Sequence, residues 1–200
     1  MELNDNETFS KIKQLYGRYK TSDNFFVELT RDLLFVAAVI SAIMVISYLT
    51  LGVFGVPAVS VISKSMDPHM KKGDLVIYKS PDRTNIITYQ EGATSGYESF
   101  ENYGNVILYY KNGDTNQIPI IHRALYWVET GEPMWDGGPS APYSGYITKG
   151  DNNSAIDQAC SISERRPIKE EWIMGVSLWR IPWLGYPTMM KEEIIKLIRK

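Results

Sequence analysis

The chain has 200 residues, enough for one domain of ordinary size or for a modest domain with an appendage. Its formal net charge of −2 gives no basic surplus for binding a nucleic-acid backbone, so we expect no nucleic-acid partner. The single cysteine, Cys160, excludes an intrachain disulfide framework and a zinc site built on a Cys-x-x-Cys pair. With only two histidines, His69 and His122, a three-histidine metal site is excluded as well, and we expect no metal and no cofactor.

Residues 1–32 form a tail of mixed charge ahead of a long apolar segment. A stretch of this tail has the spacing of an amphipathic helix, although a solvated tail is an equally good interpretation. The apolar residues with this spacing are Ile12, Leu15, Tyr16 and Tyr19. Residues 21–24 (Thr-Ser-Asp-Asn) are typical of a helix start, and they predict that the next helix begins near Phe25.

A transmembrane helix is predicted next, because no charged residue lies between Asp32 and Lys64. Residues 33–54 in this gap are mostly apolar, and as a helix they would be roughly 33 Å long, enough to cross a hydrocarbon core of about 30 Å. A buried core helix is the alternative, but such helices are usually shorter and carry one polar face. The segment is too long and too far along the chain for a cleaved signal peptide. We therefore expect an uncleaved signal-anchor in the lipid bilayer.

Basic residues on either side of this span predict its orientation. Four lie shortly before it and three shortly after it, namely Lys13, Arg18, Lys20 and Arg31, then Lys64, Lys71 and Lys72. The positive-inside bias favours a cytoplasmic N-terminus, with the rest of the chain on the extracytoplasmic side. Since no retention signal for the endoplasmic reticulum is recognisable, we expect a single-pass protein of the cell membrane.

Residues 55–187 consist of short β-like runs separated by turn residues, which is typical of a compact, mainly β domain of barrel-like form. The runs predicted as strands are residues 58–62, 75–79, 105–110, 118–121 and 124–128. Residues 80–104 and 129–146 depart from this pattern as long loops.

The C-terminal segment, residues 188–200, is predicted to be amphipathic. Its apolar face would consist of Met190, Ile194, Leu197 and Ile198. An aromatic and proline cluster that includes Trp179 and Trp183 precedes it. These residues would suit either the headgroup level of a membrane or ordinary packing on the β domain, and the sequence leaves both open.

Three further features carry reactive side chains. Ser65 precedes a Pro68 turn, and an extended backbone from Val59 onward would place the Ser63 and Ser65 hydroxyls on one face and Lys64 on the other. His122 follows a strongly apolar run, where a lone histidine is usually a structural residue. A Gly/Asn-rich turn carries two aspartates, Asp151 and Asp157, and taken alone it is typical of a surface loop.

Taken in order, four motifs of this chain resemble those of type I signal peptidases. They are Ser-x-Ser-Met-x-Pro (63–68), Lys-Gly-Asp-Leu (72–75), Ile-Pro-Ile-Ile-His-Arg (118–123), and Thr-Lys-Gly-Asp-Asn-Asn (148–153) with a second Asp six residues after the first. The similarity is greater to the branch found in archaea and the endoplasmic reticulum, which has histidine where the bacterial enzymes have a catalytic lysine. It covers roughly residues 33–187.

The resemblance implies a membrane-bound serine endopeptidase that cleaves N-terminal signal peptides from exported preproteins. It implies Ser65 as the nucleophile, His122 as the base and Asp157 as the residue that orients the imidazole, while Asp151 stays open as an alternative to Asp157. A histidine base suits this chemistry, since its ordinary pKa near 6.5 lets it accept a proton at neutral pH. The Ser65 N–H group and the Ser63 hydroxyl are the candidate oxyanion donors, because both would face one side.

The expected partners are preproteins that carry signal peptides and the lipid bilayer, with the protein-translocation channel as a further candidate. Two other functions stay open. One is a self-cleaving protease with a serine–lysine pair, which would be active only towards high pH. The other is an inactive, membrane-tethered β-domain that acts as a scaffold for protein translocation.

Overall fold

The computed structural model describes residues 5–190 of the chain. Within it the chain divides between Ile46 and Ser47 into two compact units, which are described separately below. Three residues of the predicted C-terminal apolar face, Ile194, Leu197 and Ile198, lie outside the described residues. The backbone is helical at residues 186–190, which lead into that segment.

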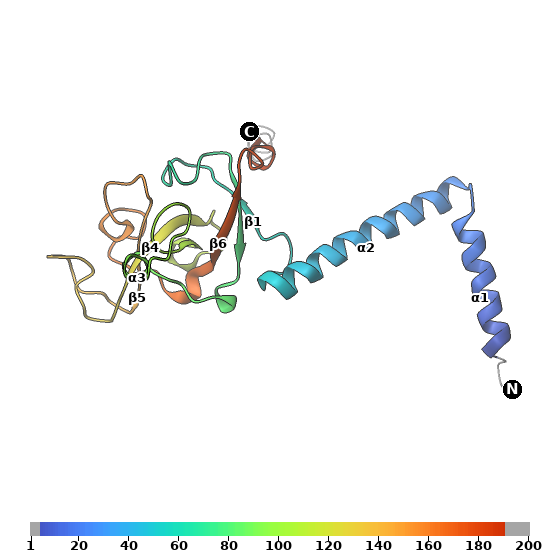
Figure 1. Ribbon diagram of the computed structural model, residues 1–200, viewed down its shortest axis with the longest axis horizontal. Helices are drawn as coiled ribbons and strands as arrows, with labels where there is room; N and C mark the ends of the chain where they lie inside the picture. Colours follow the sequence, from blue (N-terminus) through green and yellow to red (C-terminus); the bar gives the residue numbers. More distant parts are fainter. Residues whose placement is uncertain (1–4, 191–200) are drawn as a thin grey trace. The chain divides into compact units, whose positions relative to one another are not determined.

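Two helices form the N-terminal part, α1 (Asp5–Lys20), drawn in blue in Figure 1, and α2 (Phe25–Leu51), drawn in blue to cyan. Asn24 caps α2, because its Oδ1 atom accepts the Phe26 N–H at 3.0 Å, so the helix begins at the residue that the sequence predicted. At 1.5 Å per residue, the 27 residues of α2 extend over about 40 Å. It is the one helix of residues 5–190 that is long and apolar enough to cross a membrane.

The end of α2 differs from the expectation by three residues. The helix stops at Leu51, not at Phe54, because Gly52 takes a left-handed backbone with φ of +71°. The Gly52 N–H still closes the last turn on the Tyr48 carbonyl at 3.0 Å. The predicted span and the observed helix therefore share residues 33–51.

A six-stranded antiparallel sheet forms the C-terminal unit, in the order β1-β2-β6-β3-β4-β5 (Figure 1). The strands are β1 (Ala58–Ser60), β2 (Leu75–Lys79), β3 (Val106–Tyr109), β4 (Ile120–Val128), β5 (Gly145–Lys149) and β6 (Ile173–Ile181). This arrangement confirms the expected fold class, an N-terminal apolar helix followed by a mainly β domain.

Two sequence predictions about individual strands are corrected by the sheet. The runs 118–121 and 124–128 are one strand, β4, because His122 and Arg123 are both buried and hydrogen-bonded, so they do not interrupt it. The run 58–62 ends as a strand at Ser60. Strands β5 and β6 were not predicted at all.

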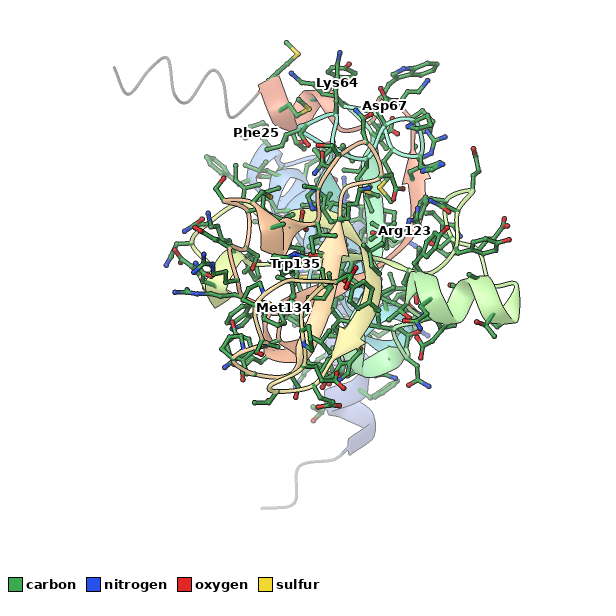
Figure 2. The ribbon with its side chains drawn as sticks, turned by 90° about the vertical axis from the view of Figure 1, so that its left-hand side faces the viewer. Phe25, Lys64, Asp67, Arg123, Met134 and Trp135 are labelled. Atoms are coloured by element: carbon green, nitrogen blue, oxygen red, sulfur yellow. The ribbon has the colours of Figure 1, made fainter. Side chains whose placement is uncertain are left out.

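The two long loops carry structure of their own. Residues 80–104 include helix α3 (Tyr89–Ser95), which starts with a capping box between Thr88 and Glu91. Residues 129–146 bury Met134 and Ala141 against the neighbouring strands, and Figure 2 labels Met134 beside Trp135. Four short 3₁₀ helices complete the unit: η1 (Pro81–Arg83), η2 (Lys111–Gly113), η3 (Asp157–Ala159) and η4 (Glu170–Trp172).

One hydrophobic cluster determines where the turn after β1 lies. Met66 and Met70 of this turn are fully buried, and they pack in a cluster with Val61, Val76 and Val106. Burying a methionine side chain contributes about 1.5–3 kcal/mol, so this turn is firmly attached to the sheet. Lys64 and Asp67 of the same turn lie at one end of the domain in Figure 2.

Candidate active site

Ser65 lies in the turn that Met66 anchors. Its Oγ atom is 3.0 Å from Ser63 Oγ, and its N–H donates to the same Ser63 oxygen at 3.4 Å. An extended strand would keep these two hydroxyls further apart, so the backbone bends here, whereas the sequence predicted that it would continue straight to Ser65. The Ser63 hydroxyl and the Ser65 N–H therefore lie together, but through a turn and not through strand alternation.

His122 is the third residue of β4 and lies opposite Ile107 of β3. Its side chain is almost fully buried, and its Nδ1 atom lies 2.6 Å from Asp157 Oδ2. Since a carboxylate only accepts hydrogen bonds, Nδ1 carries the proton and Nε2 is left as the acceptor nitrogen.

Gly150 shows where His122 Nε2 lies. A Cβ atom added at Gly150 would come 2.9 Å from His122 Nε2 and 2.6 Å from the Ser65 carbonyl oxygen. The free nitrogen of the imidazole and the backbone of the serine therefore lie against the same glycine. Among the described residues no hydrogen bond joins Ser65 Oγ to His122, because the hydroxyl is bonded to Ser63. Such contacts often form only with substrate bound.

Asp157 begins η3 and is fully buried. Its Oδ2 atom accepts three hydrogen bonds: from His122 Nδ1 at 2.6 Å, from the Tyr109 hydroxyl at 2.8 Å and from Thr148 Oγ1 at 2.6 Å. Burial, and then the negative charge of Asp157, raise the pKa of the Tyr109 phenol well above its usual range. The phenol therefore stays protonated and remains a donor.

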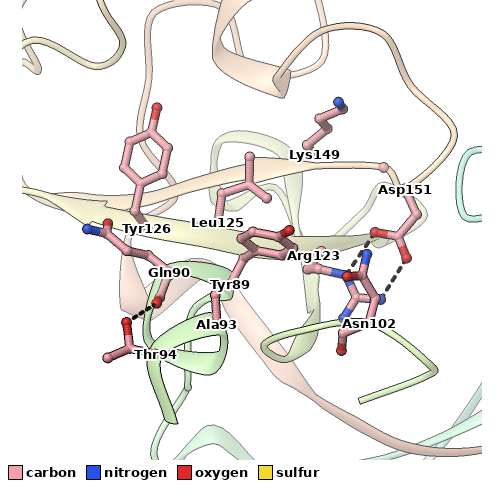
Figure 3. A pocket seen from close by; sticks show the side chains of 11 residues that line it. Tyr89, Gln90, Ala93, Thr94, Asn102, Arg123, Leu125, Tyr126, Lys149 and Asp151 are labelled. Carbon is pink, nitrogen blue, oxygen red and sulfur yellow. Dashed lines mark hydrogen bonds and ion pairs between the residues drawn. The ribbon is translucent and has the colours of Figure 1, made fainter. Parts of the chain in front are cut away.

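Asp151 occupies a different position, shown in Figure 3. The Arg123 guanidinium binds both of its oxygens, with Nε to Oδ1 at 2.8 Å and Nη2 to Oδ2 at 2.6 Å. His69 Nδ1 lies 2.7 Å from the same Oδ2. Arg123 Nη1 also donates to backbone carbonyls of the 99–104 loop, the shortest contact being 2.8 Å to Gly104. Asp151 is thus placed with the second histidine and with a buried arginine.

The Asp151 turn also holds the serine in place. The Asn152 N–H donates to the Ser65 carbonyl at 2.8 Å, and Asn152 Nδ2 donates to the Lys64 carbonyl at 3.1 Å. Because Arg123 and His69 fix Asp151, they fix these contacts as well. The 148–153 motif is thus linked to the 63–68 motif by one backbone hydrogen bond and one hydrogen bond from the Asn152 side chain.

Ser65 and His122 line one cleft of about 400 Å³. Most of its other lining is apolar, including Val61, Met66 and Ile121. No lysine is among the described residues that line it. Within residues 5–190, no group of three histidine, cysteine, aspartate or glutamate side chains is placed to hold a metal ion.

The structure adds residues to this site that the sequence analysis missed. Tyr109 is one of two adjacent tyrosines at the end of an apolar run, and nothing in the sequence distinguishes it. Thr148 is a polar residue within the run Tyr146-Ile147-Thr148, and its burial could have been inferred had β5 been predicted. Arg123 directly follows His122 in the motif, but its partner Asp151 is 28 residues away.

No protein-family model matches the chain. The signal peptidase complex catalytic subunit SEC11 of Pyricularia oryzae is 31% identical over 137 residues, which make up 68% of this chain and 64% of that protein. The corresponding subunits of Metarhizium robertsii and Chaetomium globosum are each 30% identical over 137 residues with the same coverage. The chain thus spans somewhat less than two thirds of the length of these relatives. Over this region the chain is a homologue of the SEC11 catalytic subunits, the endoplasmic-reticulum type of signal peptidase I.

Proposed function

We propose that this protein is a membrane-anchored serine endopeptidase that removes N-terminal signal peptides from exported preproteins. The main observation in its support is the geometry of His122, which lies 2.6 Å from Asp157 on one side and shares a cleft with Ser65 on the other. These residues occupy the positions that the motifs of the family assign to base, acid and nucleophile. The similarity to signal peptidase subunits supports the same activity.

The proposed first step is attack on the substrate carbonyl by Ser65. Its hydroxyl turns from Ser63 towards His122, and His122 Nε2 takes the proton as the C–O bond forms. The Asp157 carboxylate accepts the Nδ1 proton of the imidazolium and stabilises its charge. The Ser65 N–H and the Ser63 hydroxyl, which the turn brings together, donate to the oxyanion.

The intermediate then collapses by breaking the peptide C–N bond. His122 gives its proton to the departing amine, and an acyl-Ser65 ester remains. A water molecule, deprotonated by the same imidazole, attacks the ester carbonyl. The acyl C–O bond to Ser65 then breaks, His122 returns the proton to Ser65 Oγ, and the signal peptide leaves with a new C-terminal carboxylate. Asp151 takes no part in these transfers, since Arg123 and His69 occupy its carboxylate.

The apolar cleft suits an extended peptide. Segments 60–63 and 118–121 both contribute to its lining, and a substrate strand beside them would gain main-chain hydrogen bonds. By family resemblance, small side chains one and three positions before the scissile bond would be preferred. Substrate preference would then depend on how much side-chain volume this 400 Å³ cleft accepts.

Helix α2 would anchor the enzyme as a single span. Residues 33–51 of the predicted signal-anchor 33–54 are helical and would cross the bilayer, with residues 1–32 in the cytoplasm and residues 55–187 as the catalytic domain on the other side. The homology favours the endoplasmic-reticulum membrane over the cell membrane that the sequence analysis predicted. As the relatives are named as subunits of a complex, further subunits are proposed partners, alongside the bilayer and the translocation channel.

A cleavage assay tests this function. The full chain in detergent is incubated with a preprotein, and mass spectrometry locates the new N-terminus. We expect one cut at the end of the signal peptide, lost in Ser65→Ala but kept in Ser140→Ala, which alters an exposed serine outside the cleft. Cleavage elsewhere, or cleavage by Ser65→Ala, would overturn the proposal. A scaffold would instead bind preproteins without turnover, in both variants alike.

A further inference from the structure

Three neighbouring strands each direct one donor at a single oxygen of Asp157. His122 comes from β4, Tyr109 from β3 and Thr148 from β5, at 2.6, 2.8 and 2.6 Å from Oδ2. All four side chains are buried, with exposures of 3% for His122 and 0% for the others. The carboxylate is thus held from both strands that flank the histidine strand.

The other oxygen, Asp157 Oδ1, is buried without a hydrogen-bond partner among residues 5–190. A buried carboxylate is costly unless donors compensate its charge. Since Oδ2 makes all of the side-chain contacts, each of its three donors carries a large share of that compensation. Loss of any one of them should therefore change the charge that His122 experiences.

Gln158 in turn orients the threonine. Its Oε1 accepts the Thr148 N–H at 3.1 Å, and its Nε2 lies 3.5 Å from Thr148 Oγ1. Because Gln158 donates to this hydroxyl, the Thr148 proton is directed to Asp157, its nearest acceptor. The tyrosine has a phenol that stays protonated, as shown above, so both residues are permanent donors at neutral pH.

We propose that Tyr109 and Thr148 are positioning residues that act through Asp157 on His122. This inference rests on the function proposed above. The two hydroxyls fix the carboxylate so that it accepts the Nδ1 proton, which leaves Nε2 facing the cleft. They also reduce the negative charge available to the imidazolium, and so limit how strongly His122 retains a proton.

The groups around Asp157 determine the sign of the expected pH effect. The titratable side chains that face it are His122 and Tyr109, together with Cys160, whose thiol donates to the Asp157 carbonyl at 3.4 Å. Removing the Tyr109 hydroxyl leaves the carboxylate more negative, so the imidazolium persists to higher pH. The acid limb of kcat should move up by about 0.5–1 pH unit.

The experiment compares Tyr109→Phe with Tyr110→Phe, which removes the same atom from the next residue. We measure kcat and KM for a preprotein from pH 5 to 9, using the full chain in detergent. In Tyr109→Phe we expect kcat to fall on the order of 10-fold at pH 7, with KM within twofold and the acid limb shifted upward. Tyr110→Phe should match the wild type. An unchanged pH profile and kcat in Tyr109→Phe would overturn the proposal.

A second pair of variants, at Thr148, tests the proposal even if Tyr109→Phe does not fold. Thr148→Ser keeps the hydroxyl and should retain the wild-type profile, whereas Thr148→Val should shift it as Tyr109→Phe does. Equal behaviour of the two threonine variants would contradict a role for the hydroxyl.

A readout without substrate separates this inference from the proposed function. The chain has only two histidines, so ¹⁵N imidazole signals can be assigned with one His69→Gln variant. The midpoint of the His122 titration should rise in Tyr109→Phe even if no preprotein is cleaved, which would leave the positioning role standing and refute the peptidase. An unmoved midpoint would refute the positioning role, whether or not cleavage occurs.

Discussion

Gly150→Ala places a methyl group at the point where the serine and the histidine meet. The new Cβ would lie 2.6 Å from the Ser65 carbonyl oxygen and 2.9 Å from His122 Nε2, whereas ordinary contact begins near 3.4 Å. The backbone at Ser65 or at Gly150 must therefore move by about 0.8 Å. Misplacement of reacting groups by about 1 Å can lower a rate about 100-fold, so we expect kcat to fall by about that factor. Overpacking should also lower the free energy of unfolding by about 1–3 kcal/mol.

Preprotein cleavage and thermal unfolding, measured on the same preparations, test this expectation. Gly17→Ala is the matched control, since a Cβ there meets no atom within 4 Å and the residue lies in helix α1. The control should keep its cleavage rate. If folded Gly150→Ala cleaves within twofold of the wild-type rate, the placement of Nε2 against Gly150 and Ser65 is wrong.

Three further expectations concern charge and pH. Arg123→Met leaves Asp151 buried without its guanidinium partner, so it should lower the free energy of unfolding by about 3–5 kcal/mol, measured by denaturant titration. A loss below about 1 kcal/mol would contradict a stabilising buried ion pair between Arg123 and Asp151. The pKa of Tyr109 is raised in the folded state, so its contribution to stability is complete below the usual tyrosine pKa of 10.0 and is lost as the pH rises above that value. Melting temperatures should therefore fall more steeply at high pH in the wild type than in Tyr109→Phe. With a histidine base, the rate of cleavage should decline as the pH drops through about 6–7, and Lys64→Ala should keep this pH profile. A cleavage rate that rises only near pH 9 would indicate a lysine base.

Helix α2 and strands β1 to β4 could be predicted from local patterns, but strands β5 and β6, helix α3 and the strand boundaries around the site could not. Asn24 and the run of apolar residues after Asp32 are local signals, and they predicted the start of α2 correctly. The β4 strand was divided in two because His122 and Arg123 look like an interruption. Their burial depends on Asp157 and Asp151, which are 35 and 28 residues further along the chain.

The hydrogen-bond partners of the site residues could likewise not be inferred from the sequence. The resemblance to signal peptidases named Ser65, His122 and two aspartates, but left the roles of Asp151 and Asp157 open. Only tertiary structure shows that Asp157 lies with His122 and that Asp151 lies with Arg123 and His69. Tyr109 carries no sequence signal, because its contact with Asp157 depends on the pairing of strands and not on any neighbouring residue.

The two histidines offer the most direct test of the central claim, that Ser65 is activated by His122. The initial rate of preprotein cleavage at neutral pH is measured for the wild type, Ser65→Ala, His122→Ala and His69→Ala, each confirmed to be folded. The account predicts losses of at least about 1,000-fold for Ser65→Ala and His122→Ala, with measurable cleavage retained by His69→Ala. Wild-type cleavage by folded His122→Ala, or loss confined to His69→Ala, would contradict it.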